Sequence, residues 1–209
     1  MPRPPLPPPP PPAEIQAWPD RGALLADRAR AMRELGRRAL GVPAAVGFWL
    51  YALLLVIGWG CVGVALQSFA EGMFPEVLVG VVFLVLGIGA IVPAAILLGL
   101  GVRRDRVIRE RLRAWGELGP DPAVDAELRA PVRSLAWLLP SFVLAALGLW
   151  TSLGWSARAL PGEDTYAEAA YFIGMGCVLW LVGLLGVLKA VRHYRWALRS
   201  AHTPTGAES

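Results

Sequence analysis

The chain has 209 residues, of which 56% are hydrophobic and 17% are charged, and its formal net charge is +4. The charged residues avoid four long apolar stretches. That pattern excludes a water-soluble globular domain, whose helices are usually shorter and keep a polar face. The arginine-rich composition, which lacks asparagine, favours a bacterial origin. The basic charge indicates contact with a membrane surface, and we expect no nucleic-acid partner.

The first 19 residues form a proline-rich segment that begins with PRPPLPPPPPP at positions 2–12. Proline lacks the backbone N–H that a helix needs, so this run favours the polyproline II conformation. We expect residues 1–19 to be a disordered cytoplasmic tail. The alternative is that the proline run docks on an aromatic-lined groove.

Residues 20–40 have the spacing of an amphipathic helix, with an apolar edge at Leu25, Met32 and Leu35 and arginines around the rest. The sequence RAMRELG at 30–36 returns as RAWGELG at 113–119, and each copy stands a short way before an uncharged stretch. We therefore predict a cytoplasmic helix ahead of the first span.

Four stretches without Asp, Glu, Lys or Arg predict four transmembrane helices. A span needs about 20 apolar residues, and a central charge costs about 2.5–3.5 kcal/mol. The predicted spans are residues 45–68, 77–101, 134–155 and 168–190. Residues 20–101 thus hold the amphipathic helix and the first two spans, and residues 134–190 hold the last two.

The basic linker, residues 102–133, carries a helical stripe of Ile108, Leu112, Trp115 and Leu118. We expect this helix to continue the second span and then to bend onto the lipid headgroups. A second basic segment, residues 191–209, follows the last span. The arginines of these two segments are expected to contact anionic lipid or a cytoplasmic partner; they are Arg103, Arg104, Arg106, Arg109, Arg192, Arg195 and Arg199.

Charge asymmetry predicts the orientation. Lys and Arg are concentrated before the first span, in the linker and after the fourth span, whereas the connections near Gly72 and Gly162 are acidic. By the positive-inside rule both termini and the linker are cytoplasmic. We therefore expect a multi-pass protein of the bacterial cytoplasmic membrane.

The recurring sequences also indicate a duplicated unit. The second span ends in LLGLGVRRDR (97–106) and the fourth in LLGVLKAVRHYR (184–195). A two-helix hairpin that starts and ends on the inside would give two parallel copies. The alternative is chance similarity in a composition rich in Arg, Ala, Leu and Gly.

Small residues should mediate the packing of the spans, because the hydrophobic effect does not drive helices together in lipid. They recur at helical spacing in each span and predict an antiparallel four-helix bundle. The predicted packing residues are Gly58 and Cys61 in the first span, Gly87, Ala90 and Ala94 in the second, Ser141, Ala145, Gly148 and Ser152 in the third, and Gly174 and Cys177 in the fourth.

The sequence contains no catalytic motif, and two cysteines with His193 and His202 in the tail do not predict a metal site. We expect no catalytic residue and no cofactor. The preferred function is a non-catalytic scaffold or accessory subunit that assembles with itself or with another membrane protein. The alternative is a small channel or transporter, with a pathway lined by Gln67, Ser141, Thr151 and Ser152.

Overall fold

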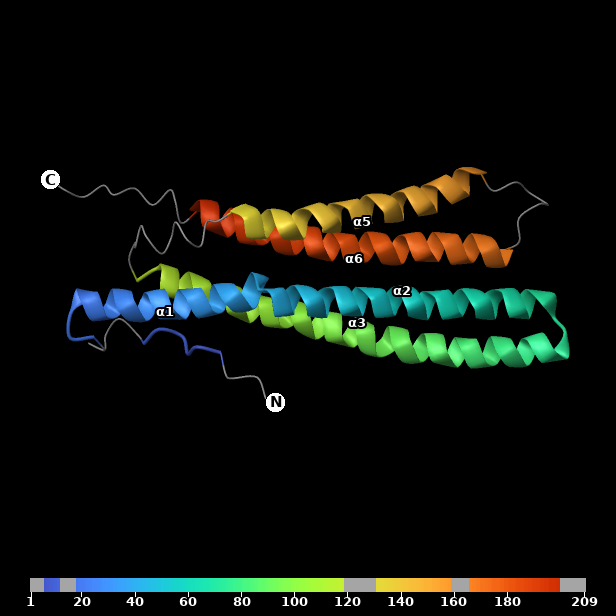
Figure 1. Cartoon of the computed structure of the whole chain (residues 1–209), viewed down its shortest axis with the longest axis horizontal. Coiled ribbons are helices and arrows are strands. Elements are labelled where there is room, and N and C mark those ends of the chain that lie inside the picture. The colour runs from blue at the N-terminus through green and yellow to red at the C-terminus, as the bar shows by residue number, and fades with distance from the viewer. Residues whose placement is uncertain (1–5, 12–17, 119–130, 159–165, 200–209) are drawn as a thin grey trace.

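The structure, a computed structural model, describes residues 6–11, 18–118, 131–158 and 166–199 (Figure 1). Every regular element in these ranges is an α-helix. In chain order the helices are α1 (Arg21–Leu40), α2 (Val42–Glu71), α3 (Phe74–Gly116), α5 (Pro131–Arg158) and α6 (Tyr166–Arg199).

Four helical segments are long and apolar enough to cross a membrane, and each contains one predicted span. The prediction of an all-helical protein with four apolar helices is therefore confirmed for the described residues. Most of the apolar surface of these helices is exposed. Such surfaces suit an environment of lipid or of neighbouring membrane helices.

Helices α2 and α3 form a hairpin whose turn is set by two residue types. Gly72 ends α2 in the left-handed conformation, with φ 72° and ψ −1°. Glycine reaches this conformation without the steric cost that a Cβ atom imposes. Pro75 stands in the first turn of α3, where no backbone N–H is needed and where its fixed φ suits the helix.

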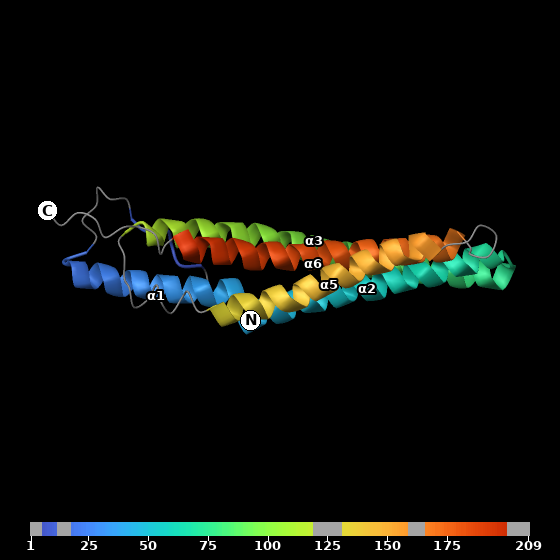
Figure 2. The ribbon, with the colours of Figure 1, turned by 90° about the horizontal axis from the view of Figure 1, so that it is seen from above.

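Helices α5 and α6 form the second hairpin, which runs in the same direction as the first. In Figure 1, α5 ends and α6 begins at the end of the molecule that also holds the α2–α3 turn. The most extensive contact between the two hairpins joins α2 to α6. Figure 2 shows the same elongated molecule after a quarter turn.

Helix α1 leads into α2 with a break at Gly41, which has φ −70° and ψ 160°. The break follows from Pro43, which stands in the first turn of α2 and favours a helix start there. A Cβ atom on Gly41 would collide with the carbonyl oxygen of Arg37, so the residue at this break must be small.

Buried apolar residues of α1, α3, α5 and α6 form one cluster, which we call the inner cluster. Its members are Ala29, Ala31, Met32, Leu35 and Ala39 of α1, Ile108, Leu112 and Trp115 of α3, Trp137 of α5 and Ala190 of α6. Large side chains such as Met32, Leu35 and Ile108 are almost completely buried in it.

The bend that we expected after the second span is absent from α3, and the inner cluster explains why. Helix α3 is a single helix from Phe74 to Gly116, and its stripe of Ile108, Leu112 and Trp115 packs against α1 instead of lying on headgroups. Helix α1 has an apolar edge of its own, and burying a large side chain gains about 1.5–3 kcal/mol. Mutual burial of the two edges therefore keeps α3 straight.

Candidate functional site

The α5–α6 hairpin closes along a seam of small residues. Gly148 of α5 lies against Gly176 of α6, and a Cβ atom on Gly148 would lie 2.6 Å from the carbonyl oxygen of Gly176. Because real Cβ atoms do not approach so closely, the two backbones are in direct contact. The other predicted α5 residues also face α6: Ser141 lies against Gly186, Ala145 against Gly183, and Ser152 against Gly176.

The α2–α3 hairpin has a similar crossing. A Cβ atom on Gly87 would lie 2.8 Å from the carbonyl oxygen of Gly58, and Ala90 lies beside Gly58. Ala94, one helical turn further along α3, is fully buried. Cys61 is half-buried and its thiol is free. Each hairpin thus contains one glycine–glycine crossing.

The residues predicted to pack from α6 are not those that contact α5. Cys177 is exposed and its thiol is free, so its assignment to the packing face is wrong. Gly174 does pack, but against the ring of Trp59 on α2. The contact with α5 is made by Gly176 and by Gly183 and Gly186 further along the helix. Successive helical residues differ by about 100°, so a shift of one position changes the face that a residue occupies.

Two aromatic side chains join the hairpins where α2 meets α6. The Nε1 of Trp59 donates a hydrogen bond to the carbonyl oxygen of Tyr171, at 2.9 Å. The Trp59 ring lies over Gly174, and the Tyr171 ring lies over Gly63. Neither glycine could carry a side chain without displacing the ring above it. This contact therefore fixes how α2 and α6 are rotated against each other.

Replacing Trp59 by phenylalanine should lower the free energy of unfolding by at least about 0.5–1.5 kcal/mol, because the hydrogen bond is lost together with part of the indole ring that covers Gly174. Unfolding of the purified protein in bicelles by titrated SDS measures this loss. Trp150→Phe is the matched control, since Trp150 is 71% exposed and is expected to show no measurable loss. Equal losses in the two variants would contradict the assigned role of Trp59.

A second contact joins the hairpins near the inner cluster. The Nζ of Lys189 on α6 lies 2.9 Å from a carboxylate oxygen of Asp105 on α3. The same ammonium group stands 4.6 Å from the ring centroid of Trp137 on α5. Trp137 is buried and its ring also contacts Phe48 of α2. The ion pair, the cation–π contact and the ring contact together join all four long apolar helices.

The arginines predicted to contact lipid or a partner lie beyond the spans on α3 and α6. Arg103 and Arg106 are exposed, while Arg104 and Arg109 are half-buried. On α6, Arg192 and Arg195 are exposed, and the side chain of Arg199 lies outside the described residues.

Three of the four polar residues considered for a channel turn their hydroxyl groups to their own helix or into the seam. The Thr151 hydroxyl donates to the carbonyl oxygen of Leu147 at 2.8 Å, and the Ser152 hydroxyl donates to that of Gly148 at 3.0 Å. Ser141 is fully buried between α5 and α6, and Gln67 is exposed on α2. These side chains do not line a common passage.

Arg28 of α1 is buried at the end of α3. Its Nε donates a hydrogen bond to the carbonyl oxygen of Trp115 at 3.1 Å, although the side chain is only 2% exposed. The last carbonyl groups of a helix lack partners within the helix, and a cation is favourable at this end. Arg28 could not be predicted from the sequence, because nothing distinguishes it from the other arginines of α1.

Part of the proline-rich segment also lies against α3. The carbonyl oxygen of Pro8 accepts a hydrogen bond from the Nε1 of Trp115 at 3.1 Å, and that of Pro7 accepts one from Arg111. Leu6 packs against the inner cluster. The expectation of a disordered tail is therefore corrected for residues 6–11; residues 1–5 and 12–17 lie outside the described part of the chain.

In the described ranges, no three His, Cys, Asp or Glu side chains gather into a group that could hold a metal ion. The structure thus presents packing seams, an ion pair between hairpins and an inner cluster with a docked proline segment. No protein-family model matches this chain, and no curated protein or solved structure is significantly similar to it.

Proposed function

We propose that this protein is a non-catalytic scaffold or accessory subunit of a complex in a bacterial cytoplasmic membrane. The observation that carries the proposal is the inner cluster, whose residues from α1 and α3 lie beyond the predicted spans. There α1 and the end of α3 bury Met32, Leu35, Ile108 and Leu112 against one another. Because these contacts fix α1 on α3, the outer faces of the two helices form a rigid surface that is suited to holding a partner beside the membrane.

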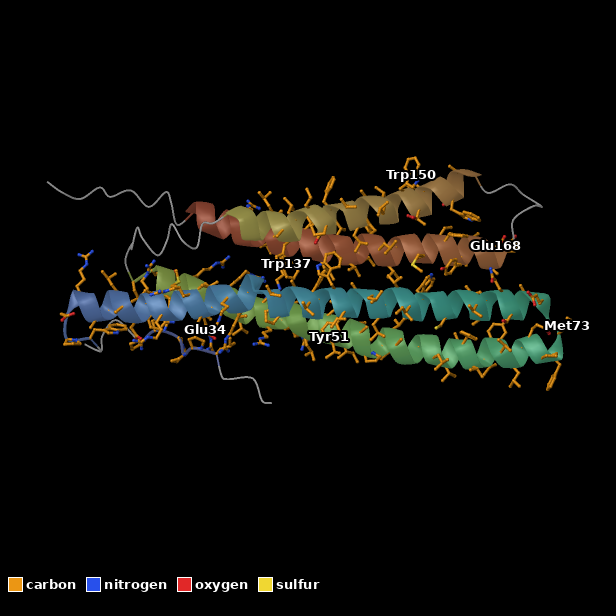
Figure 3. The ribbon with its side chains drawn as sticks, in the orientation of Figure 1. Glu34, Tyr51, Met73, Trp137, Trp150 and Glu168 are labelled. Carbon is orange, nitrogen blue, oxygen red and sulfur yellow. The ribbon has the colours of Figure 1, made fainter. Side chains whose placement is uncertain are left out.

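Charge distribution supports an orientation with both termini in the cytoplasm. The arginines of α1 and of the last parts of α3 and α6 lie at one end of the molecule (Figure 1). Figure 3 places Glu168 and Met73 at the opposite end from Glu34. The positive-inside rule assigns the arginine-rich end to the cytoplasm.

The two glycine crossings support the duplicated-hairpin hypothesis. Gly58 meets Gly87 in the first hairpin, and Gly148 meets Gly176 in the second. Both hairpins run in the same direction, as parallel copies of one unit would (Figure 1). A duplication would give an antiparallel four-helix bundle in which each hairpin has a seam of small residues of its own.

Anionic lipid and a membrane partner are the proposed neighbours of the exposed surfaces. Arg103, Arg106, Arg192 and Arg195 are exposed beyond the spans. Each would gain about 1 kcal/mol near anionic headgroups. The exposed apolar faces of the spans would contact lipid tails, a second copy of the chain or another membrane protein.

Orientation is tested by cysteine labelling in a background where Cys61 and Cys177 are replaced by alanine. We expect Met73→Cys to react in intact cells with a maleimide that cannot cross the membrane. Arg106→Cys should react only after the membrane is permeabilised. Both positions are exposed on the protein, so the difference reports the compartment. The opposite pattern would contradict the proposed orientation.

The scaffold function is tested by the mass of the intact assembly released in a gentle detergent. We expect the chain in a fixed stoichiometry with itself or with another membrane protein. Liposomes that contain the purified chain should show no more ion or solute flux than liposomes without protein. A solely monomeric chain that conducts or exchanges solutes would overturn the proposal in favour of a channel or transporter.

A further inference from the structure

The proline-rich segment is held on α3 by two side chains one helical turn apart. Arg111 donates to the carbonyl oxygen of Pro7, and the indole Nε1 of Trp115 donates to that of Pro8 at 3.1 Å. Residues four apart lie on one face of a helix, so the two donors form a single binding surface. They bind two consecutive backbone carbonyl groups of the run.

These donors match the chemistry of a proline run. A run of prolines has no backbone N–H groups to pair with its own carbonyl groups, which remain available as acceptors. The polyproline II conformation is already formed in such a run, so docking orders few residues. Aromatic surfaces with hydrogen-bond donors are the usual recognition elements for proline-rich peptides.

Trp115 is held by contacts with α1 as well as with the proline segment. The residue is 3% exposed within the inner cluster, and its carbonyl oxygen accepts a hydrogen bond from the buried Arg28. The ring of Trp18 meets it edge to face, with 6.4 Å between the ring centroids. Leu6, the one aliphatic residue in the run at positions 2–12, packs against the inner cluster beside these rings. The site thus combines an apolar contact with two donors.

We propose that Arg111 and Trp115, flanked by Trp18, form a polyproline-binding site that the protein's own residues 6–11 occupy. A proline-rich segment of another chain in polyproline II conformation is the ligand class that competes for it. This site depends only on the contacts of residues 6–11 with α3, whether the spans serve as a scaffold or as a channel.

The resident segment has an advantage over any free peptide. Only residues 12–17 separate it from Trp18, and a short connection gives an effective concentration in the mM range, as an order of magnitude. A free peptide should therefore bind well only when the resident prolines are removed. This competition distinguishes binding at a specific site from nonspecific binding to the arginine-rich helices.

The test uses the full chain in lipid nanodiscs and a labelled peptide that corresponds to residues 2–13. In one protein, residues 1–12 are replaced by a Gly/Ser segment of the same length. Fluorescence anisotropy should show saturable binding to this protein and at least about tenfold weaker binding to the intact chain. Peptides with Leu6→Gln, or with Pro7 and Pro8 replaced by glycine, should bind about fivefold more weakly or worse.

Substitutions on the helix test the site itself. In the Gly/Ser protein, Arg111→Gln should weaken peptide binding about fivefold, because a charged donor is lost. Arg113→Gln is the matched control, since it removes the same charge from an exposed position of the same helix and should leave binding unchanged. Trp115→Phe, which keeps an aromatic side chain but loses the indole donor, should weaken binding about threefold or more.

The peptide variants and the two arginine variants decide the question even if Trp115→Phe fails to fold. The proposal would be overturned if the peptide did not bind the Gly/Ser protein, or bound it no better than it binds protein-free nanodiscs. Equal effects of Arg111→Gln and Arg113→Gln, or equal affinity for the intact chain, would overturn it as well.

Discussion

Replacing Gly148 by valine is expected to lower the free energy of unfolding by about 2–3 kcal/mol, the upper part of the range for overpacked sites. The Cβ atom alone would lie 2.6 Å from the carbonyl oxygen of Gly176 and would also meet the backbone of Trp180. Backbone atoms cannot rotate away as a side chain does, so α5 and α6 would have to separate. SDS titration of the purified protein in bicelles measures the loss.

Gly89→Val is the matched control for this prediction. Gly89 lies inside α3 and is exposed, and a Cβ atom there would have no neighbour within 4 Å. Both variants exchange a helical glycine for the same branched side chain, so they share any change in helix propensity. The control should stay within about 0.5 kcal/mol of the wild type. If both variants unfold alike, the α5–α6 seam is not the cause.

The second large effect is expected from Lys189→Met, which should lower the free energy of unfolding by about 2–3 kcal/mol. It leaves Asp105 without its ion-pair partner, and the Asp105 and Lys189 side chains are only 19% and 16% exposed. Removing one partner of a fully buried ion pair costs about 3–5 kcal/mol of stability. The residual exposure of the Lys189–Asp105 pair reduces that cost. The same unfolding titration in bicelles gives the value.

Two further variants make the Lys189 result decisive. Arg30→Met removes one partner of a surface pair with Asp27, at 3.9 Å and with side chains 83% and 47% exposed, and should cost less than about 1 kcal/mol. Adding Asp105→Asn to Lys189→Met should recover part of the loss, because the uncompensated carboxylate is then removed. A loss at Lys189 no larger than that at Arg30 would contradict a role for the ion pair in joining the hairpins.

The four long apolar helices were predictable because the signal is strong and local. A charge inside a bilayer is costly, so uncharged stretches of this length predict such helices. Turn positions followed as well: Gly72 lies where the acidic connection between the first two spans was expected. In each case one physical effect dominates, and neighbouring residues along the chain contain all the information.

Contacts between distant segments were harder to predict. Small residues occur on several faces of α6, so spacing alone did not distinguish Gly176, which meets α5, from the exposed Cys177. The straight course of α3 depends on α1, more than seventy residues earlier in the chain, whose apolar edge covers Ile108 and Leu112. The docking of Pro7 and Pro8 depends likewise on donors of α3. Periodicity shows which face of a helix is apolar, but it does not show what covers that face.

The contact between α1 and the last turns of α3 has a consequence for biosynthesis. Leu35 leaves the ribosome long before Ile108, Leu112 and Trp115, which cover it in the finished protein. At roughly 5–20 residues per second, the newly made amphipathic segment waits several seconds for its partner, while two spans enter the bilayer. During that interval its apolar edge is uncovered and would be able to contact a chaperone or the membrane surface. Helix α1 is therefore translated before α3 but reaches its final place only after the end of α3 has been made.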